Sequence, residues 1–431
     1  MKPYGDLHWV LSVFPLYYPR MALTAALIFL GTYALLSFEQ NIPGMHIGRS
    51  AAALLGAVAM VASGVVNLEQ SYRLVDMNTI VFLLGMMIVV SYLEISGFFA
   101  EVEILLIKRA GSTRQLLALV IASSGTLSAL FMNDAVCLML TPVLVRLASR
   151  ARLSLKPYLI ALALSANIGS AMTPMGNPQN MIVALRSGIP FGRFVLAIAP
   201  ISLLGLVGCH LALTRLYPAE FARGRSVGIH EPLPPLVRGR LLYACLGGAG
   251  LMLLLFAMNV SPPLAAISTA ALLILAGARK PREAFRRVDW DMLLMFAALF
   301  VVMGGLRRSG LVDGMLAGGG KLSAAPLGAR LAWIAAASAV LSNLVSNVPG
   351  VIFLSGFLPR LGGQPALWLA LSMSATLAGN MTILGSVANL IVFESAKGSV
   401  RVGFWEYFKA GAPLTVLLIA AGTLYLSVVF R

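Results

Sequence analysis

A succession of apolar runs, each about long enough to cross a bilayer, constrains the fold of this chain more than any other feature. Hydrophobic residues make up 59% of the 431 residues and charged residues 11%, against roughly half and a quarter in soluble domains. This pattern predicts an all-α polytopic protein of the bacterial inner membrane, with about ten transmembrane helices. The runs lie near 21 to 38, 50 to 66, 79 to 97, 158 to 185, 194 to 216, 239 to 257, 260 to 277, 290 to 306, 366 to 395 and 411 to 430.

Two further apolar stretches, 115 to 148 and 330 to 361, are each divided in the middle by a polar tip. The tips read FMNDAV and VSNVPG. Each half is short for a span, so the pattern predicts two re-entrant hairpins whose tips lie where protein or water satisfies the backbone. Two full spans for each pair is the alternative.

Internal similarity predicts two inverted repeats. The segment that begins at Val75 reappears from Val288, and the segment from Ala161 answers that from Ala370 with Thr, Gly and Asn in register. Five crossings and a hairpin that does not cross give an odd number for each repeat, so the second copy inserts upside down. The expected organisation is repeat one at 1 to 216, a linker at 217 to 238, and repeat two at 239 to 431.

The net charge of +16 belongs to short loops rather than to a nucleic-acid-binding face. Under the predicted topology the larger share of the Lys and Arg residues lies on the side of the 217 to 238 loop. The positive-inside rule places that side in the cytoplasm and both termini in the periplasm. The bilayer and a small inorganic substrate are the expected partners, and nucleic acid is not.

The fourth and ninth of these segments, 158 to 185 and 366 to 395, carry Pro, Gly and polar residues at membrane depth, and they are expected to unwind there. The side chains expected to line the resulting gaps, together with the hairpin tips, form one substrate site. The alternative is that they only join helices. The expected substrate-binding residues are Asn133, Asn167, Thr173, Asn177, Asn180, Ser346, Asn347, Thr376, Asn380, Thr382, Ser386 and Asn389.

Asp134 is the one carboxylate at a hairpin tip, and the second tip has Val348 in its place. An ionisable group at that depth predicts a functional site, here a proton-coupling group or a cation ligand. An N-cap for the following half-helix is the alternative. Asp76 and Asp289 begin matching helices and are expected to cap them, while Glu94 is expected to reach the interface.

Neither a metal centre nor an enzyme is expected. The three cysteines, Cys137, Cys209 and Cys245, lie far apart in apolar runs, and His230-Glu231 does not begin an HExxH motif. A channel is disfavoured because the two tips differ. No nucleotide-binding motif occurs, so the energy for transport is expected from a proton or Na⁺ gradient or from an ATPase subunit encoded elsewhere, with no cofactor.

The motifs MNDAVCLMLTP, SANIGSAMTPMGNPQNMIVA, SNVPG and NMTILGSVANLIV occur in this order along the chain. In them the chain resembles the ArsB/NhaD-like anion permeases of the ion transporter superfamily. The resemblance implies a scaffold domain, a mobile transport domain, and elevator-type or rocking exchange of cargo. Both tips lack the Thr of the Ser-Asn-Thr tips that sodium-coupled dicarboxylate carriers show. The first tip, followed by Leu-Thr-Pro, looks more like those of the arsenite-efflux and sodium/proton-exchange branches.

The resulting expectation is a secondary transporter that exports arsenite, antimonite or a related small inorganic oxyanion in exchange for protons. A Na⁺/H⁺ antiporter is the first alternative, and an uptake carrier for a small anion or carboxylate is the second. The sequence leaves the substrate, the coupling ion, the direction of transport and the oligomeric state open.

Overall fold

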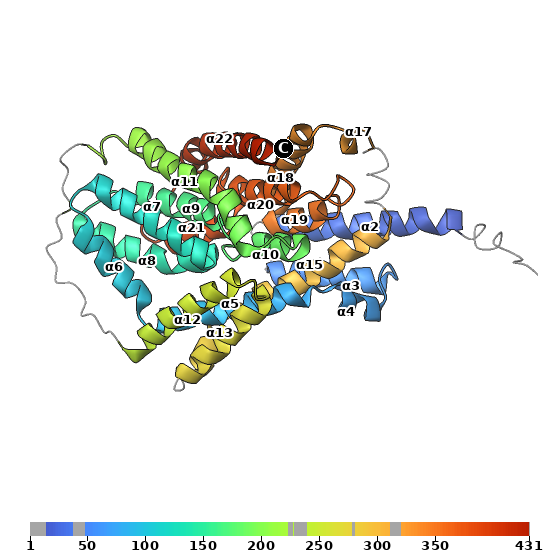
Figure 1. Cartoon of the computed structure of the whole chain (residues 1–431), viewed down its shortest axis with the longest axis horizontal. Helices are drawn as coiled ribbons and strands as arrows, with labels where there is room; N and C mark the ends of the chain where they lie inside the picture. Colours follow the sequence, from blue (N-terminus) through green and yellow to red (C-terminus); the bar gives the residue numbers. More distant parts are fainter. Residues whose placement is uncertain are drawn as a thin grey trace, which may run out of the picture. The chain divides into compact units, whose positions relative to one another are not determined.

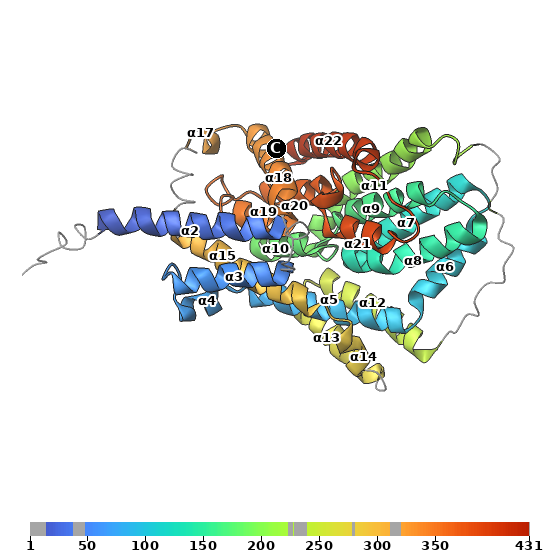
Figure 2. The same cartoon turned by 180° about the vertical axis from the view of Figure 1, so that it is seen from behind.

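The computed structural model describes residues 14–37, 48–222, 227, 239–277, 281–310 and 320–430, and these residues form helices and turns without a β-strand. The chain divides into two compact units, residues 1–80 with 289–325, and residues 81–288 with 326–431. Figures 1 and 2 show the labelled helices from opposite sides.

The first unit holds the opening helices of repeat one and the third apolar helix of repeat two. Its helices are α2 (Phe14–Ser37), α3 (Arg49–Ala62), α4 (Leu68–Leu74), the start of α5 (Met77–Ile95), α15 (Trp290–Arg308) and α17 (Gly320–Ser323). Asp289 Oδ1 accepts from Met292 N at 2.9 Å, and Asp76 accepts from the backbone and hydroxyl of Thr79. Both carboxylates therefore cap the helices that follow them, as expected from their positions.

Glycines let the helices of the first unit approach closely. A Cβ on Gly56 would meet Thr32 Oγ1, and a Cβ on Gly305 would meet Met60 Sδ. Tyr33 Oη also contacts Met303 Sδ at 3.6 Å. Contacts through small residues are the usual way for helices to pack in a bilayer, where no hydrophobic effect drives their association.

The second unit contains both hairpins and both interrupted helices. The helices of its first half are α6 (Phe98–Arg109), α7 (Thr113–Leu130), α8 (Asn133–Ala151), α9 (Leu155–Ser170), α10 (Pro178–Ser187) and α11 (Phe191–Leu216). Its second half holds α12 (Arg240–Ala257), α13 (Pro262–Ala276), α14 (Pro281–Arg286), α18 (Leu327–Val345), α19 (Asn347–Ser355), α20 (Pro365–Ala378), η1 (Ile383–Gly385), α21 (Val387–Ser395) and α22 (Phe404–Val429).

The predicted membrane plan is confirmed. Helices lie at all ten expected runs, α7 with α8 and α18 with α19 form the two hairpins, and the expected interruptions separate α9 from α10 and α20 from α21. Six helices in the described ranges are long and apolar enough to cross a membrane, and four shorter apolar helices lie at others of the expected runs. Helix α2, at the first expected run, begins at Phe14 rather than near residue 21.

Two helices of the second unit lie outside the expected runs, α6 and α14, and both carry charged residues. Helix α6 is amphipathic, and its buried Glu103 pairs with Arg146 of α8 at 2.6 Å. Glu94 forms an ion pair with Arg287, just after α14, which raises the pKa of Arg287 through their hydrogen bond. Glu94 is thus partnered by protein rather than only reaching the interface.

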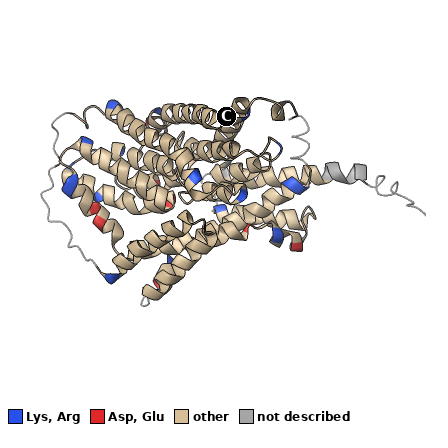
Figure 3. Cartoon of the chain, viewed as in Figure 1, with Lys and Arg blue, Asp and Glu red and all other residues tan. Residues whose placement is uncertain are grey.

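Many charged residues lie near helix ends, as the blue and red bands on the ribbon show in Figure 3. One such cluster joins the starts of α9 and α22 to the end of α11. Lys156 Nζ pairs with Glu406 at 3.0 Å, and Tyr217 Oη donates to the same carboxylate at 3.0 Å. Burial, followed by the charge of Glu406, raises the pKa of Tyr217 well above its usual value, so its hydroxyl remains a donor.

Candidate functional site

The first interruption, between α9 and α10, is held open by one buried asparagine. Asn180 Nδ2 donates to the carbonyls of Ser170, Ala171 and Thr173, at 3.0, 3.2 and 2.9 Å. Asn177 is the N-cap of α10, because its side chain accepts from Asn180 N at 2.9 Å. Proline at the first position of α10 has no N–H to leave unpaired. The unwound carbonyls are therefore satisfied inside the protein.

The second interruption, between α20 and α21, repeats this plan. Asn389 Nδ2 donates to the carbonyls of Gly379 and Thr382 at 2.8 and 3.0 Å. Asn389 follows Asn180 by 209 residues, and its two acceptors follow Ser170 and Thr173 by the same interval. The residues that repeat in the sequence at this interval therefore make equivalent hydrogen bonds in the two repeats.

The hairpin tips contact the interruptions in matching ways. Asn133 N donates to the carbonyl of Gly176 at 2.9 Å. Asn347 uses its side chain instead of its backbone: in the amide orientation that satisfies both the oxygen and the nitrogen, its Nδ2 donates to the corresponding carbonyl of Gly385 at 3.2 Å. Each tip therefore lies against the interruption of its own repeat.

Asn167 joins the two repeats at the centre of the site. Its Oδ1 accepts from Asn133 Nδ2 at 2.8 Å and from Ser386 Oγ at 3.1 Å. Its Nδ2 donates to Asn380 Oδ1 at 2.9 Å and to Asn389 Oδ1 at 3.0 Å. Because every partner is a side chain, this centre is a network of neutral amides and one hydroxyl.

Thr376, which occupies the position of Asn167 in repeat two, makes a second bridge. Its hydroxyl accepts from Asn177 Nδ2 and Gln179 Nε2, both at 3.2 Å, and donates to Asn180 Oδ1 at 3.0 Å. Ser372 Oγ donates to the same Asn180 oxygen at 2.5 Å. Helices α9, α20 and α21, side by side in Figures 1 and 2, thus share one polar interior.

Asp134 lies in the first turn of α8 and is half-buried. The N-cap of that helix is Met132, so the N-cap role considered for Asp134 is wrong. A carboxylate in a first helical turn is still stabilised by the helix dipole. Asp134 directly follows Asn133, which contacts both the first interruption and Asn167, so a change of charge at Asp134 occurs beside the network.

Three buried polar atoms near the tips have no hydrogen-bond partner among the described residues. They are the hydroxyls of Ser128 and Ser342, which are equivalent in the two repeats, and Oδ1 of Asn133. Buried polar atoms are seldom left unsatisfied without a functional reason. These atoms can donate to or accept from a small polar molecule.

Most of the predicted site residues lie in this one network. The side chains of eight of them bond directly to side chains of others of the set, namely Asn133, Asn167, Asn177, Asn180, Thr376, Asn380, Ser386 and Asn389. Thr173 bonds to the carbonyl of Ala129, and Thr382 bonds to Asn343 Oδ1 at 3.2 Å. Ser346 is exposed, with a left-handed φ of 89°.

Sequence reasoning missed several members of the network, namely Ser170, Gln179, Asn343 and Ser372. Gln179 corresponds to Ala388, and Ser372 corresponds to Ala163. A search for polar residues repeated in register passes over such positions. The signal that was available is their polarity inside an otherwise apolar segment.

Comparison with known proteins agrees with this architecture. Residues 33–368 match the model of the CitMHS citrate transporter family. The silicon efflux transporter LSI3 of Oryza sativa is 30% identical, and the match covers 91% of this chain and 95% of that protein. An uncharacterized transporter of Mycobacterium tuberculosis is also 30% identical, over 94% and 98% of the two chains.

More distant relatives point the same way. A Dictyostelium discoideum protein described as a transporter, arsB, is 24% identical over 92% of this chain and 90% of its own. The crystal structure of the Alcanivorax borkumensis YdaH transporter, reported to have an unusual topology, has the same fold with a TM-score of 0.59. Its identity is 16%, and the match covers 96% of this chain and 98% of that one. The chain therefore belongs to the CitMHS citrate transporter family, within the ion transporter superfamily, and is a membrane transporter rather than an enzyme.

Proposed function

We propose that this transporter exports a small, uncharged, hydroxyl-rich metalloid acid, arsenite or antimonite, from the cytoplasm in exchange for protons. One observation carries the proposal: the site consists of amides and hydroxyls, and segments 165–180 and 372–389 contain no charged residue. An acid that is neutral at pH 7 presents only hydroxyl groups. Amides and hydroxyls match it because they both donate and accept.

The same chemistry disfavours a multiply charged cargo. Burying a carboxylate without a paired charge is costly, so a site for citrate is expected to place Arg or Lys beside it. Two relatives support the neutral cargo through their descriptions, one as a silicon efflux transporter and the other as arsB. Silicic acid, like arsenite, is a neutral hydroxylated species, and it is a further member of the proposed substrate class.

A small anion or carboxylate is the second candidate. The half-helices α10 and α21 both begin at the site, with N-caps Asn177 and Ser386. Helix N-termini favour negative charge. The family's description as citrate transporters adds to this candidate, so anions belong in every competition experiment.

In the proposed cycle Asp134 carries the coupling proton. Its carboxylate is protonated from the periplasmic side and releases the proton to the cytoplasm, while the neutral cargo moves outward. One positive charge then enters for each cargo molecule. Coupling arises because the charge on Asp134 changes beside Asn133, whose amide bonds to Asn167 at the centre of the network.

Everted membrane vesicles test this proposal directly. Acidification of the vesicle interior is expected to drive uptake of arsenite, and unlabelled antimonite is expected to compete. Asp134→Asn, which fixes a neutral side chain, is expected to reduce proton-driven uptake to the level of vesicles without the protein. Asp289→Asn is the matched control, because asparagine replaces an N-cap aspartate well.

Three outcomes would contradict the proposal. Normal proton-driven uptake by Asp134→Asn, at normal expression, removes the coupling role. Competition by citrate or succinate but not by antimonite favours the carboxylate carrier. Proton release driven by Na⁺ in the absence of any cargo favours the Na⁺/H⁺ antiporter.

The proposed direction requires an orientation, with both termini in the periplasm and the 217 to 238 linker in the cytoplasm. Most of that linker lies outside the described residues. Labelling of Arg223→Cys with a membrane-impermeant reagent tests the orientation. Labelling in intact cells would reverse it.

A further inference from the structure

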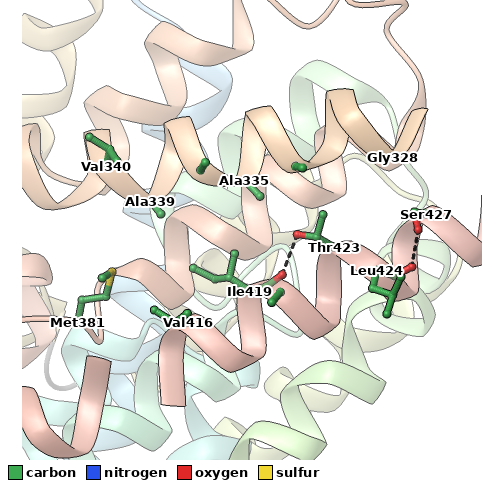
Figure 4. A pocket seen from close by; sticks show the side chains of 13 residues that line it. Gly328, Ala335, Ala339, Val340, Met381, Val416, Ile419, Thr423, Leu424 and Ser427 are labelled. Carbon is green, nitrogen blue, oxygen red and sulfur yellow. Dashed lines mark hydrogen bonds between the residues drawn. The ribbon is translucent and has the colours of Figure 1, made fainter. Parts of the chain in front are cut away.

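A long apolar groove lies between α18 and α22, in the second unit. Its volume is about 640 Å³. Figure 4 shows the facing side chains of the two helices, with Met381 and Val416 at one end and Gly328 and Ser427 at the other. Met381 directly precedes Thr382, so the first end of the groove lies at the second interruption.

The groove has the length of one bilayer leaflet. Val416 and Ser427 are eleven residues apart on α22, which corresponds to about 16 Å at the helical rise. Half of the hydrocarbon core is about 15 Å. Helix α22 ends two residues beyond Ser427, so the groove runs from a membrane surface inward to the level of the interruption.

The lining is suited to hydrocarbon rather than to water. Alanines 332, 335, 336 and 339 form most of the α18 wall. The hydroxyls of Thr423 and Ser427 are already bonded to the carbonyls of Ile419 and Leu424, each at 2.7 Å. Water is held in cavities by several polar partners, and these walls offer few. Both walls belong to helices that expose apolar side chains in a membrane span.

The equivalent face of repeat one carries larger side chains. Helix α11 corresponds to α22 at an interval of 213 residues, with Pro200 matching Pro413. Ile121 occupies the position of Ala335, and Val207 occupies the position of Ala420. Leu206, at the position of Ile419, lies beside Gly125, where a Cβ would come within 2.9 Å of it. His210 likewise replaces Thr423. The side chains on the two faces differ in size, and the smaller side chains of repeat two leave space for the groove.

A cation lies beside the C-terminal end of α22, which is also the end at which Ser427 lines the groove. The guanidinium of Arg193 lies 5.9 Å from the centre of the Phe430 ring. Phe430 follows Ser427 by three residues, so it continues the same face of α22. Arg193 is exposed. A phosphate at the membrane surface would find a positive partner there, at the point where a hydrocarbon chain enters the groove.

We propose that this groove binds one acyl chain of an anionic membrane phospholipid, with the headgroup phosphate at Arg193. The chain fills the space between α18 and α22, and its methyl end reaches Met381. It supports the second hairpin and the second interruption from the lipid side. This proposal concerns the membrane and not the cargo, so it stands apart from the proposed function.

Filling the groove with protein tests the proposal. Ala336 and Ala420 are exposed and line opposite walls, so Ala336→Leu with Ala420→Leu occupies the groove without overpacking the interior. Ala421→Leu is the matched control, because Ala421 is an exposed neighbour on α22 that does not line the groove. The probe is phosphatidylglycerol added to delipidated full-length protein in neutral detergent, with phosphatidylcholine as the second arm.

The native chain and Ala421→Leu are expected to retain one phospholipid per chain in native mass spectrometry, and added phosphatidylglycerol is expected to raise their melting temperature. The filled variant is expected to bind it about tenfold more weakly, a change of ~1.4 kcal/mol. Arg193→Gln is expected to lose the preference for phosphatidylglycerol over phosphatidylcholine but to keep chain binding.

Equal lipid retention by the filled variant and the control would overturn the proposal. A fall in oligomeric state in the filled variant, without a change in bound lipid, would also overturn it and assign the groove to a second copy of the chain. An unchanged headgroup preference in Arg193→Gln would remove Arg193 from the site.

Discussion

The interruptions of the two repeats share a hydrogen-bond plan but differ in how firmly they are enclosed. In the first, residues 171–177 are buried apart from the half-buried Met172. In the second, Met381, Thr382 and Ile383 are half-buried, and the side chain of Leu384 is 71% exposed. The second interruption also contains a short 3₁₀ turn.

The hydrogen bonds of the two equivalent threonines, Thr173 and Thr382, also indicate that the first interruption is held more firmly. Thr173 bonds to the backbone carbonyl of Ala129, whereas Thr382 bonds to the side chain of Asn343. Ala129 and Asn343 are equivalent positions, 214 residues apart. A side-chain acceptor can change rotamer, while a helix carbonyl cannot. The comparison indicates that repeat one provides the rigid half of the site and that repeat two provides the half that can change conformation.

The largest expected effect comes from removing the asparagines that hold the unwound carbonyls. Asn180→Ala leaves three buried carbonyls without that donor and two hydroxyls without that acceptor. Asn389→Ala leaves two carbonyls without that donor and the side-chain N–H of Asn167 without that acceptor. Each unsatisfied group costs about 1–3 kcal/mol. The free energy of unfolding is therefore expected to be lower in Asn180→Ala than in Asn389→Ala by about 2 kcal/mol. Melting temperatures in detergent measure this difference. Equal losses would mean that the two halves are equally rigid.

A smaller difference is expected at the glycines that follow each threonine. A Cβ on Gly176 would lie 2.2 Å from the carbonyl oxygen of Ser170, which is fixed backbone. On Gly385 it would lie 2.9 Å from Asn343 Oδ1 and from the carbonyl of Gly379. Gly176→Ala is expected to cost about 2–3 kcal/mol and Gly385→Ala about 1 kcal/mol.

Thermal unfolding and retained transport would measure the cost at both glycines. Gly192→Ala is the control, because a Cβ there meets nothing within 4 Å. A more severe loss at Gly385 than at Gly176 would reverse the assignment of the rigid half.

The sequence was sufficient for the architecture because the repeats preserve polar residues in register inside apolar segments. Asn180 and Asn389 were recognisable in this way, and both hold the carbonyls of their interruptions. Helix α6 could not be found by a search for apolar runs, because it is amphipathic and its buried Glu103 is paired with Arg146. Charge within a sequence does not reveal whether a distant partner will neutralise it.

The candidate site was only partly predictable for two physical reasons. Ser372 and Asn343 have alanines at the equivalent positions of repeat one, so a comparison of the two repeats does not identify them. Ser346 belongs to the tip motif, but the structure places it at an exposed position with a left-handed backbone. The start of α8 at Asn133, rather than after Asp134, likewise depends on contacts between the tip and Gly176 that only the fold provides.

The smallest effect is expected where the repeats are most alike. Ser165 bonds to Ser124 and to the carbonyl of Ala161, and Ser374 bonds to Ser338 and to the carbonyl of Ala370. Each serine pair joins a hairpin arm to an interrupted helix.

Replacement of Ser165 or Ser374 by alanine removes one hydrogen bond between buried hydroxyls, and the remaining serine keeps a bond to its own helix. Each variant is expected to lose about 1 kcal/mol, and the two melting temperatures are expected to agree. If Ser374→Ala were much more damaging than Ser165→Ala, the arm of the second hairpin would depend on this contact, and the greater freedom of repeat two would have to lie in its interruption alone.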